Sequence, residues 1–260
     1  MKLPIYQVDA FASRLFSGNP AAVVVMDDWL PDAVLQAIAA ENNLSETAFV
    51  IPRGQRCPLR WFTPTFEIDL CGHATLATAH VLFARRFPEM DALHFETLSG
   101  ILTVRRENGL LFMDFPARPG DAVPVTPELV AALGRRPREL RRSRDLMAVF
   151  DTEAEVRNFV PDQARIAGLD AMALIVTAPG SDADFVSRFF APKAGVAEDP
   201  VTGSSHCTLI PYWAARLGRD RLSARQLSAR GGELHCELRA GRVVIGGRAV
   251  DYLQGEIDVP

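Results

Sequence analysis

Hydrophobic residues in the first half of the chain recur mainly at strand spacing, interrupted by two stretches at helical spacing. The expected strands are residues 5–11, 21–26, 48–51, 59–62, 101–105 and 110–115. The last two flank Asn108-Gly109, a pair typical of tight hairpins. A helix is expected to open at Pro31 and run to residue 40, and a second helix to cover residues 74–86.

The second half repeats this style after a proline-rich segment, residues 116–127, which we interpret as a linker. Thr126 and Pro127 have the residue types of a helix cap and a first helical position. Further strands are expected at residues 146–150, 171–178 and 184–190, then a helix over 205–217, then turn-punctuated strands. Many strands with few helices favour a largely antiparallel α+β protein.

The two halves also resemble each other. Residues 60–64, Arg-Trp-Phe-Thr-Pro, match residues 188–192, Arg-Phe-Phe-Ala-Pro, at three positions. Each segment is followed by a polar loop and a glycine, Gly72 or Gly203, where a helix starts. We therefore expect two pseudo-symmetric lobes, residues 1–117 and 118–260, with the last strands free to return to the first lobe. Two helix N-termini facing one cleft would bind a carboxylate.

Composition narrows the function further. A net charge of −4 argues against a general nucleic-acid partner, and no apolar run approaches the ~20 residues of a membrane span. Four dispersed cysteines predict reduced thiols in the cytoplasm. With neither phosphate-binding glycine motifs nor zinc-type spacings, we expect no cofactor and no metal. The six arginines within residues 135–144 are interpreted as a solvated surface helix or loop.

Four segments place polar residues where a core would be apolar, and each alone is compatible with an ordinary turn or helix cap. They are Ser17–Pro20, Asn43–Ala48, Asp69–Thr75 and Glu198–His206. Together with Asp9-Ala10-Phe11 and Pro211-Tyr212-Trp213, these segments resemble the PhzF-like isomerase family of phenazine biosynthesis. The resemblance spans nearly the whole chain. It implies the diaminopimelate epimerase-like fold: two similar lobes, each a mostly antiparallel sheet wrapped round a central helix, with the site in the cleft between them.

The resemblance also implies residue roles. The catalytic residues would be Glu46, His73, Asp199 and Ser204, and further substrate contacts would come from Asn19, Gly72, Thr202 and Gly203. Glu46 would act as general acid/base, taking a proton from carbon and returning it elsewhere. A hydroxyl and backbone N–H groups at the two helix starts would hold a carboxylate while negative charge develops beside it. The expected activity is a cofactor-independent isomerisation of a small carboxylate-bearing metabolite by a homodimer.

Two alternatives stay open. Cys71 could serve an amino-acid racemase or epimerase, because related epimerases use a thiol in a Cys-Gly setting together with a second thiol. The segment Asp199–Gly203 offers no such second cysteine, so a buried packing role for Cys71 is favoured. The chain could also be a non-catalytic small-molecule-binding or protein-binding member of the family.

Overall fold

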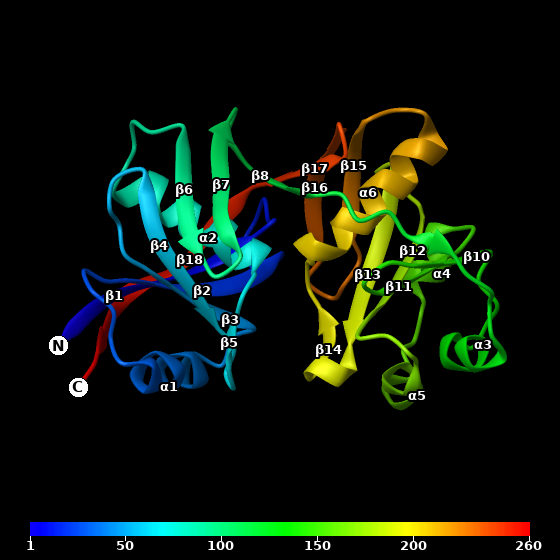
Figure 1. Ribbon diagram of the computed structural model, residues 1–260, viewed down its shortest axis with the longest axis horizontal. Coiled ribbons are helices and arrows are strands. Elements are labelled where there is room, and N and C mark those ends of the chain that lie inside the picture. The colour runs from blue at the N-terminus through cyan, green and yellow to red at the C-terminus, as the bar shows by residue number, and fades with distance from the viewer. The chain divides into compact units, whose positions relative to one another are not determined.

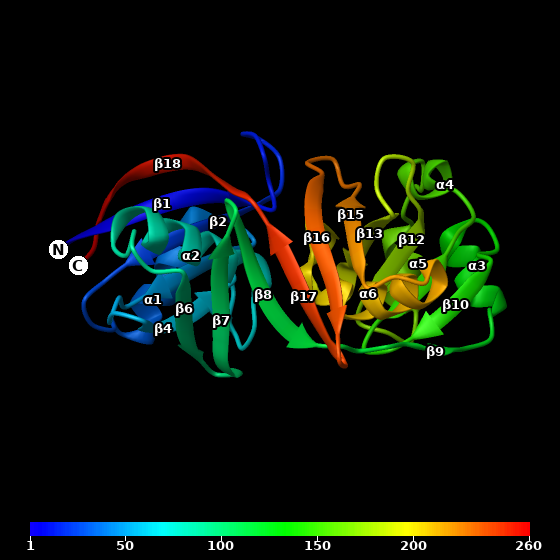
Figure 2. The same ribbon diagram turned by 90° about the horizontal axis from the view of Figure 1, so that it is seen from above.

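The computed structural model describes residues 1–260, which form two compact units (Figure 1). The first unit comprises Met1–Asp114 and Gly246–Pro260, and the second comprises Phe115–Ile245. The chain thus enters the second unit just before the expected boundary at residue 117. The last fifteen residues belong to the first unit, an arrangement that the sequence left open, because the final strand pairs antiparallel with the first from Lys2↔Asp258 to Ala10↔Ala249. Figure 2 shows these two strands side by side.

The first unit has a sheet and two helices. Its strands are β1 (Lys2–Ala10), β2 (Asn19–Val25), β3 (Glu46–Val50), β4 (Arg56–Phe62), β5 (Glu67–Ile68), β6 (Ala92–Thr97), β7 (Gly100–Glu107) and β18 (Ala249–Asp258). Its helices are α1 (Asp32–Asn42) and α2 (Gly72–Arg85). The chain leaves this unit along β8 (Leu110–Pro116) and returns along β17 (Arg242–Gly247). The hairpin predicted at Asn108-Gly109 is confirmed, with both residues at positive φ.

The second unit has its own strands and helices. Its strands are β9 (Asp121–Ala122), β10 (Glu139–Arg142), β11 (Leu146–Val149), β12 (Leu174–Pro179), β13 (Phe185–Ala191), β14 (Val196–Asp199), β15 (Arg221–Gln226) and β16 (Gly232–Arg239). Its helices are α3 (Pro127–Leu133), α4 (Glu153–Arg157), α5 (Gln163–Gly168), α6 (Gly203–Leu217) and the 3₁₀ turn η1 (Pro192–Ala194). Thr126 caps α3 as its sequence predicts, by accepting a hydrogen bond from the Leu129 N–H group.

Strand pairing follows the same plan in both units. In the first, β2 pairs parallel with β3 across α1, β3 pairs antiparallel with β4, and β4 pairs parallel with β6 across α2. In the second, β11 pairs parallel with β12 across α4 and α5, β12 pairs antiparallel with β13, and β13 pairs parallel with β15 across α6. The internal repeat read from the sequence is therefore a repeat of topology.

Side chains repeat along with the topology. Arg60 on β4 donates two hydrogen bonds to the carboxylate of Glu67 on β5, from Nε and a terminal nitrogen, at 2.7 and 2.6 Å. Arg188 on β13 grips Glu198 on β14 in the same way, at 2.7 and 2.9 Å. The second copy is three residues longer between strand and helix, and the three residues of η1 account for the difference. When the three residues of η1 are left out of the alignment, Gly72 and Gly203 occupy corresponding positions, each at the start of a helix.

The central helix of each unit is largely buried. Helix α2 packs against β1, β2, β3, β7 and β18, and α6 packs against β15 and β16 (Figures 1 and 2). Most residues of both helices are buried, as expected for apolar helices in the core of a unit. Neither helix, nor any other in the structure, combines the length and apolar character needed to cross a bilayer.

Two sequence interpretations need correction. The proline-rich segment 116–127 is not a free linker: the N–H groups of Ala117 and Arg118 donate to the carbonyls of Gly241 and Cys207, and β9 pairs with β10. The arginine run is not a helix: Arg141 and Arg142 lie in β10, whereas the other four arginines lie in the loops on either side of that strand, as the loop interpretation expected. Five of its six arginines pair with acidic side chains, the pairs being Arg135–Glu155, Arg138–Asp151, Arg141–Glu139, Arg142–Asp170 and Arg144–Asp145.

Gly18, in the turn before β2, has no space for a side chain. Its φ is +70°, and a Cβ atom there would lie 2.2 Å from the Ala10 carbonyl oxygen and 2.8 Å from the Ala12 Cβ. Gly18→Ala should therefore lower the free energy of unfolding by about 1–3 kcal/mol or more. The new side chain would strain the backbone at positive φ, and the atoms it meets belong largely to the backbone and cannot move away easily. Gly54→Ala is the control, since Gly54 has a φ of +64° but open space around it. Urea unfolding should show the larger loss for Gly18→Ala, and equal losses would contradict the steric argument.

Candidate active site

One candidate cluster, in the first unit, lies where β3 and α2 begin. Glu46 is the first residue of β3 and not, as expected, part of the loop ahead of it. It pairs with Ala21 on β2, so Asn19, which starts β2, lies at the same end of the sheet. Cys71 is the N-cap of α2 in an extended conformation, and His73 lies in the first turn. His73 is thus not the helix cap that its sequence position allowed.

Three side chains meet at this end of the sheet. His73 Nε2 lies 3.1 Å from Glu46 Oε2, an ion-pair distance, and both atoms are buried without a hydrogen-bond partner. The other ring nitrogen, Nδ1, lies 3.5 Å from Cys71 Sγ. Cys71 and His73 are buried, and the Glu46 side chain is 17% exposed. The imidazole therefore separates a carboxylate on one side from a thiol on the other.

The surroundings set the protonation of this cluster. Burial by itself lowers the pKa of His73, but the acidic groups of Cys71 and Glu46 outweigh burial and hold that pKa well above its usual value. Burial raises the pKa of the Cys71 thiol, and the neighbouring Glu46 charge raises it further. The directions of these two pKa shifts favour a proton on the His73 ring and a proton on the Cys71 thiol.

The same three residues could in principle hold a metal ion, because one donor atom from each lies within 4.8 Å of the others. A histidine gives an ion only one ring nitrogen, however, and here each nitrogen faces a different partner. An ion would have to turn the ring or draw one acidic group across it. The arrangement as it stands suits proton transfer better than three-ligand coordination.

A second candidate cluster, in the second unit, lies where β14 ends and α6 begins. Asp199 is the last residue of β14, Thr202 is the N-cap of α6, and Gly203 and Ser204 open the helix. The Thr202 hydroxyl donates to the Asp199 carboxylate. Ser204, like His73, lies inside the first turn and does not cap its helix. Thr202 occupies the place in this unit that Cys71 occupies in the other, so no second thiol stands there.

Two residues that carry no sequence motif hold this second cluster in place. The Gln226 side-chain oxygen accepts a bond from the Thr202 N–H group at 2.9 Å, and its nitrogen donates to the Asp199 carbonyl at 2.8 Å. Arg144 donates to the Ser204 hydroxyl at 3.3 Å and also to Asp145. Gln226 therefore fixes the turn that carries Asp199, and Arg144 brings positive charge to the start of α6.

Comparison with known proteins decides the family. The model of the family described as "Phenazine biosynthesis-like protein" matches residues 8–255. The chain belongs to this family. An uncharacterized isomerase of Pseudomonas aeruginosa is 52% identical over 257 residues, which cover 99% of each chain. Phenazine biosynthesis-like domain-containing protein 2 of Mus musculus is 43% identical over 286 residues, again covering 99% of each.

Solved structures agree. A PhzF family protein of Enterococcus faecalis superimposes with a TM-score of 0.98 at 50% identity, covering 100% of both chains. A predicted epimerase of Pseudomonas aeruginosa has a TM-score of 0.76 at 20% identity, covering 99% of this chain and 100% of that one, which shows a shared fold. The expected α+β class with two epimerase-like lobes is thereby confirmed, and at the family level the chain is a PhzF-like isomerase.

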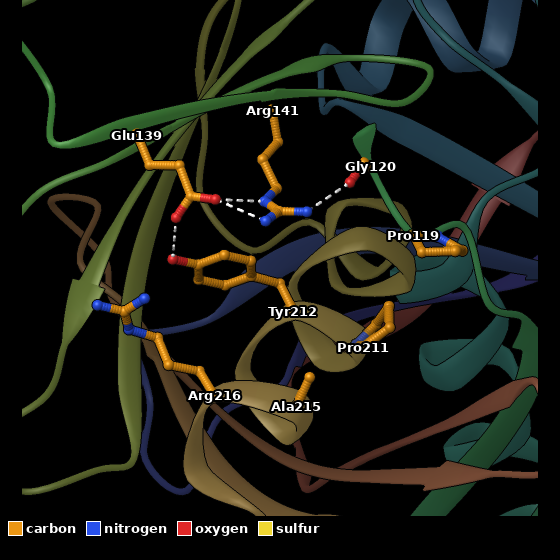
Figure 3. Close-up of a pocket in the computed structure, with 8 residues that line it drawn as sticks. All are labelled: Pro119, Gly120, Glu139, Arg141, Pro211, Tyr212, Ala215 and Arg216. Atoms are coloured by element: carbon orange, nitrogen blue, oxygen red, sulfur yellow. Dashed lines mark hydrogen bonds and ion pairs between the residues drawn. The ribbon is translucent and has the colours of Figure 1, made fainter. Parts of the chain in front are cut away.

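A separate pocket of about 420 Å³ lies in the second unit of this PhzF-family protein (Figure 3). Tyr212, from one of the segments that carried the resemblance, donates its hydroxyl hydrogen to Glu139 at 2.9 Å, and Arg141 donates to Glu139 and to the Gly120 carbonyl. Burial raises the pKa of Tyr212 to about 12. None of the predicted site residues lines this pocket, and its polar groups largely bind one another, so we assign it no part in catalysis.

His206, in the first half of α6, predicts a pH-dependent stability. Its Nδ1 lies 2.8 Å from the Thr202 carbonyl, and burial lowers the pKa of His206 to about 4. Unfolding returns that pKa to about 6.5, so the unfolded chain binds the extra proton first. About 3 kcal/mol of stability, present above pH 6.5, should be lost as the pH falls toward 4.

The variant His206→Asn keeps a donor for the Thr202 carbonyl but cannot titrate. Urea unfolding at pH 7 and pH 4.5 should show a smaller pH-dependent loss in this variant than in the unaltered protein. An identical loss in both would assign the effect to other groups.

Proposed function

We propose that the chain is a cofactor-independent isomerase that shifts a proton within a small carboxylate-bearing metabolite, with Glu46 as general acid/base. The observation that carries the proposal is the buried contact between Glu46 Oε2 and His73 Nε2 at the start of α2. A carboxylate can accept a proton from carbon, and the same group can return that proton elsewhere.

The proposed step is a balanced proton shift. Glu46 takes a proton from a carbon of the substrate, and the electron pair of the broken C–H bond spreads toward the neighbouring unsaturated groups. Glu46 then returns the proton to a different carbon, so that substrate and product are isomers and nothing is oxidised or reduced. His73, 3.1 Å away, compensates the Glu46 charge before and after the transfer.

The remaining predicted residues would bind the substrate. Each unit offers donors for a carboxylate at a helix start: the N–H group of Gly72 in the first unit, and the N–H group of Gly203 with the Ser204 hydroxyl in the second. Such donors would oppose the negative charge that develops beside a substrate carboxylate. Asp199, oriented by Thr202, would accept a hydrogen bond from a substrate amino or hydroxyl group. Asn19 lies at the Glu46 end of the sheet and would add a further polar contact.

Solvent exchange tests the proposal before the physiological substrate is known. The protein would be incubated in D₂O with a panel of unsaturated carboxylates bearing an amino or hydroxyl group, and C–H signals followed by proton NMR. We expect loss of one C–H signal and growth of a deuterated isomer without added cofactor. A panel in which compounds bind but none exchanges would favour a non-catalytic, ligand-binding protein instead.

One observation keeps an amino-acid racemase or epimerase as a second candidate: Cys71 Sγ lies within hydrogen-bond reach of His73. Against it stands Thr202, whose position corresponds to that of Cys71 and which carries no thiol. Deuterium at Cα of an amino acid, abolished by Cys71→Ser, would support the racemase. Deuterium at another carbon, abolished by Glu46→Gln, would support the isomerase.

A further inference from the structure

The four thiols of the chain are all buried and free, but their surroundings differ. Cys57 Sγ faces a backbone carbonyl, that of Gly54, at 3.5 Å. Cys207 lies in α6, where burial raises the pKa of its thiol to about 11. Cys71 instead faces Nδ1 of His73, the ring whose opposite side faces Glu46. Packing alone explains the first two, whereas Cys71 contacts a side chain of the candidate site.

The backbone holds the Cys71 sulfur in place. Cys71 is the N-cap of α2, and its carbonyl accepts hydrogen bonds from the Thr75 N–H group at 3.2 Å and from the Thr75 hydroxyl. Its φ and ψ of −141° and 111° turn the residue out of the helix, so its side chain stands beside the first turn. The sulfur is thus a fixed reference point for His73, two residues further on.

A histidine ring has two orientations that fill nearly the same space and differ by a half-turn about its Cβ–Cγ bond. The half-turn exchanges Nδ1 with a carbon and Nε2 with a carbon. In the observed orientation both nitrogens have polar partners: Nδ1 faces Cys71 at 3.5 Å and Nε2 faces Glu46 at 3.1 Å. In the other orientation C–H groups would face both neighbours, so the thiol would lose its hydrogen-bond partner and the carboxylate its ion-pair partner.

We propose that Cys71 is a positioning residue, whose sulfur accepts a hydrogen bond from His73 Nδ1–H and thereby keeps Nε2 directed at Glu46. The role of His73 in catalysis rests on the proposed function, but its orientation in the resting protein does not. The raised pKa of His73 agrees with a proton on both ring nitrogens at neutral pH. Sulfur is a weak acceptor, so the contact orients the ring more than it stabilises the fold.

Nuclear magnetic resonance of the resting protein tests this inference. With ¹⁵N-labelled histidine, an Nδ1–H group protected by a hydrogen bond gives a one-bond ¹H–¹⁵N signal, whereas a freely exchanging one does not. The His73 signal would be identified by its absence from a His73→Asn variant. We expect it in the unaltered protein at pH 7, its loss in Cys71→Ala, and its retention in Cys71→Ser, where a hydroxyl can accept the same bond.

Cys57→Ala is the matched control, because it removes a buried thiol that faces a backbone carbonyl. That variant should keep the His73 signal. The proposal is overturned if Cys71→Ala keeps the signal at its original shift, or if Cys57→Ala or Cys71→Ser loses it. The measurement involves no turnover, so a failed exchange assay would count against the isomerase and not against the positioning role.

Discussion

Replacing Glu46 by glutamine is expected to lower the rate of solvent-deuterium exchange into a substrate by about 10²–10⁴-fold. Glutamine keeps the shape of the side chain and can still approach His73 Nε2, 3.1 Å away in the unaltered protein. It cannot accept a proton from carbon, so the step that breaks the C–H bond loses its base. Ligand affinity should stay within a few-fold, because the carboxylate-binding groups belong to other residues.

Two variants make the measurement decisive. Glu41→Gln removes a carboxylate from the exposed surface of α1 and should leave exchange unchanged. Cys71→Ala should reduce exchange by less than Glu46→Gln, by up to about 10²-fold if His73 loses its orientation. If Glu46→Gln kept the full rate while Cys71→Ala abolished it, the thiol chemistry of a racemase would become the better account.

Local sequence patterns predicted the parts of this fold that depend on neighbouring residues. The Asn108-Gly109 turn, the Thr126 cap and the end of α6 at Gly218 each follow from residues within one turn of the chain. The interpretation of the proline-rich segment as a linker missed its packing, because the hydrogen-bond partners of Ala117 and Arg118 lie far away in the sequence. Prolines indicate where regular structure stops, but not whether the segment packs against something else.

For the candidate site, too, the sequence predicted some features and could not predict others. Its motifs pointed to Glu46 and His73 through their resemblance to the PhzF-like family, because each segment alone is compatible with an ordinary turn or helix cap. They could not show that the imidazole lies against Cys71, since that depends on a side-chain rotamer. Gln226 and Arg144 carry no sequence signal of their own. Each acts on a residue 24 to 60 positions away, and only the folded sheet brings them together.

Replacing Arg188 by methionine is expected to cost about 3–5 kcal/mol of unfolding free energy, the largest stability loss we predict. Arg188 is 9% exposed and binds Glu198 through two nitrogens, while its third nitrogen donates to the carbonyls of Phe159 and Val156. Methionine would fill much of the space but leave a half-buried carboxylate and two carbonyls without their donor.

The equivalent Arg60 supplies the internal control for this prediction. Its side chain is 21% exposed against 11% for Arg188, and its second partner, Asp32, is 76% exposed. Water can replace more of what Arg60 provides, so Arg60→Met should shift the urea midpoint less than Arg188→Met. In addition, Arg188→Met combined with Glu198→Leu should recover part of the loss, because the stranded carboxylate is then absent.

The Arg188 pair also connects the fold to the site. Glu198 immediately precedes Asp199 on β14, and Asp199 pairs in register with Phe189, next to Arg188 on β13. Loss of the Glu198 ion pair should therefore loosen the strand that presents Asp199. Substrate binding should then weaken even without urea, at temperatures where the protein stays folded. Arg60→Met, which touches the other unit, should leave that binding step intact. Equal weakening of binding in both variants would show that the effect is a general loss of stability and not a displacement of Asp199.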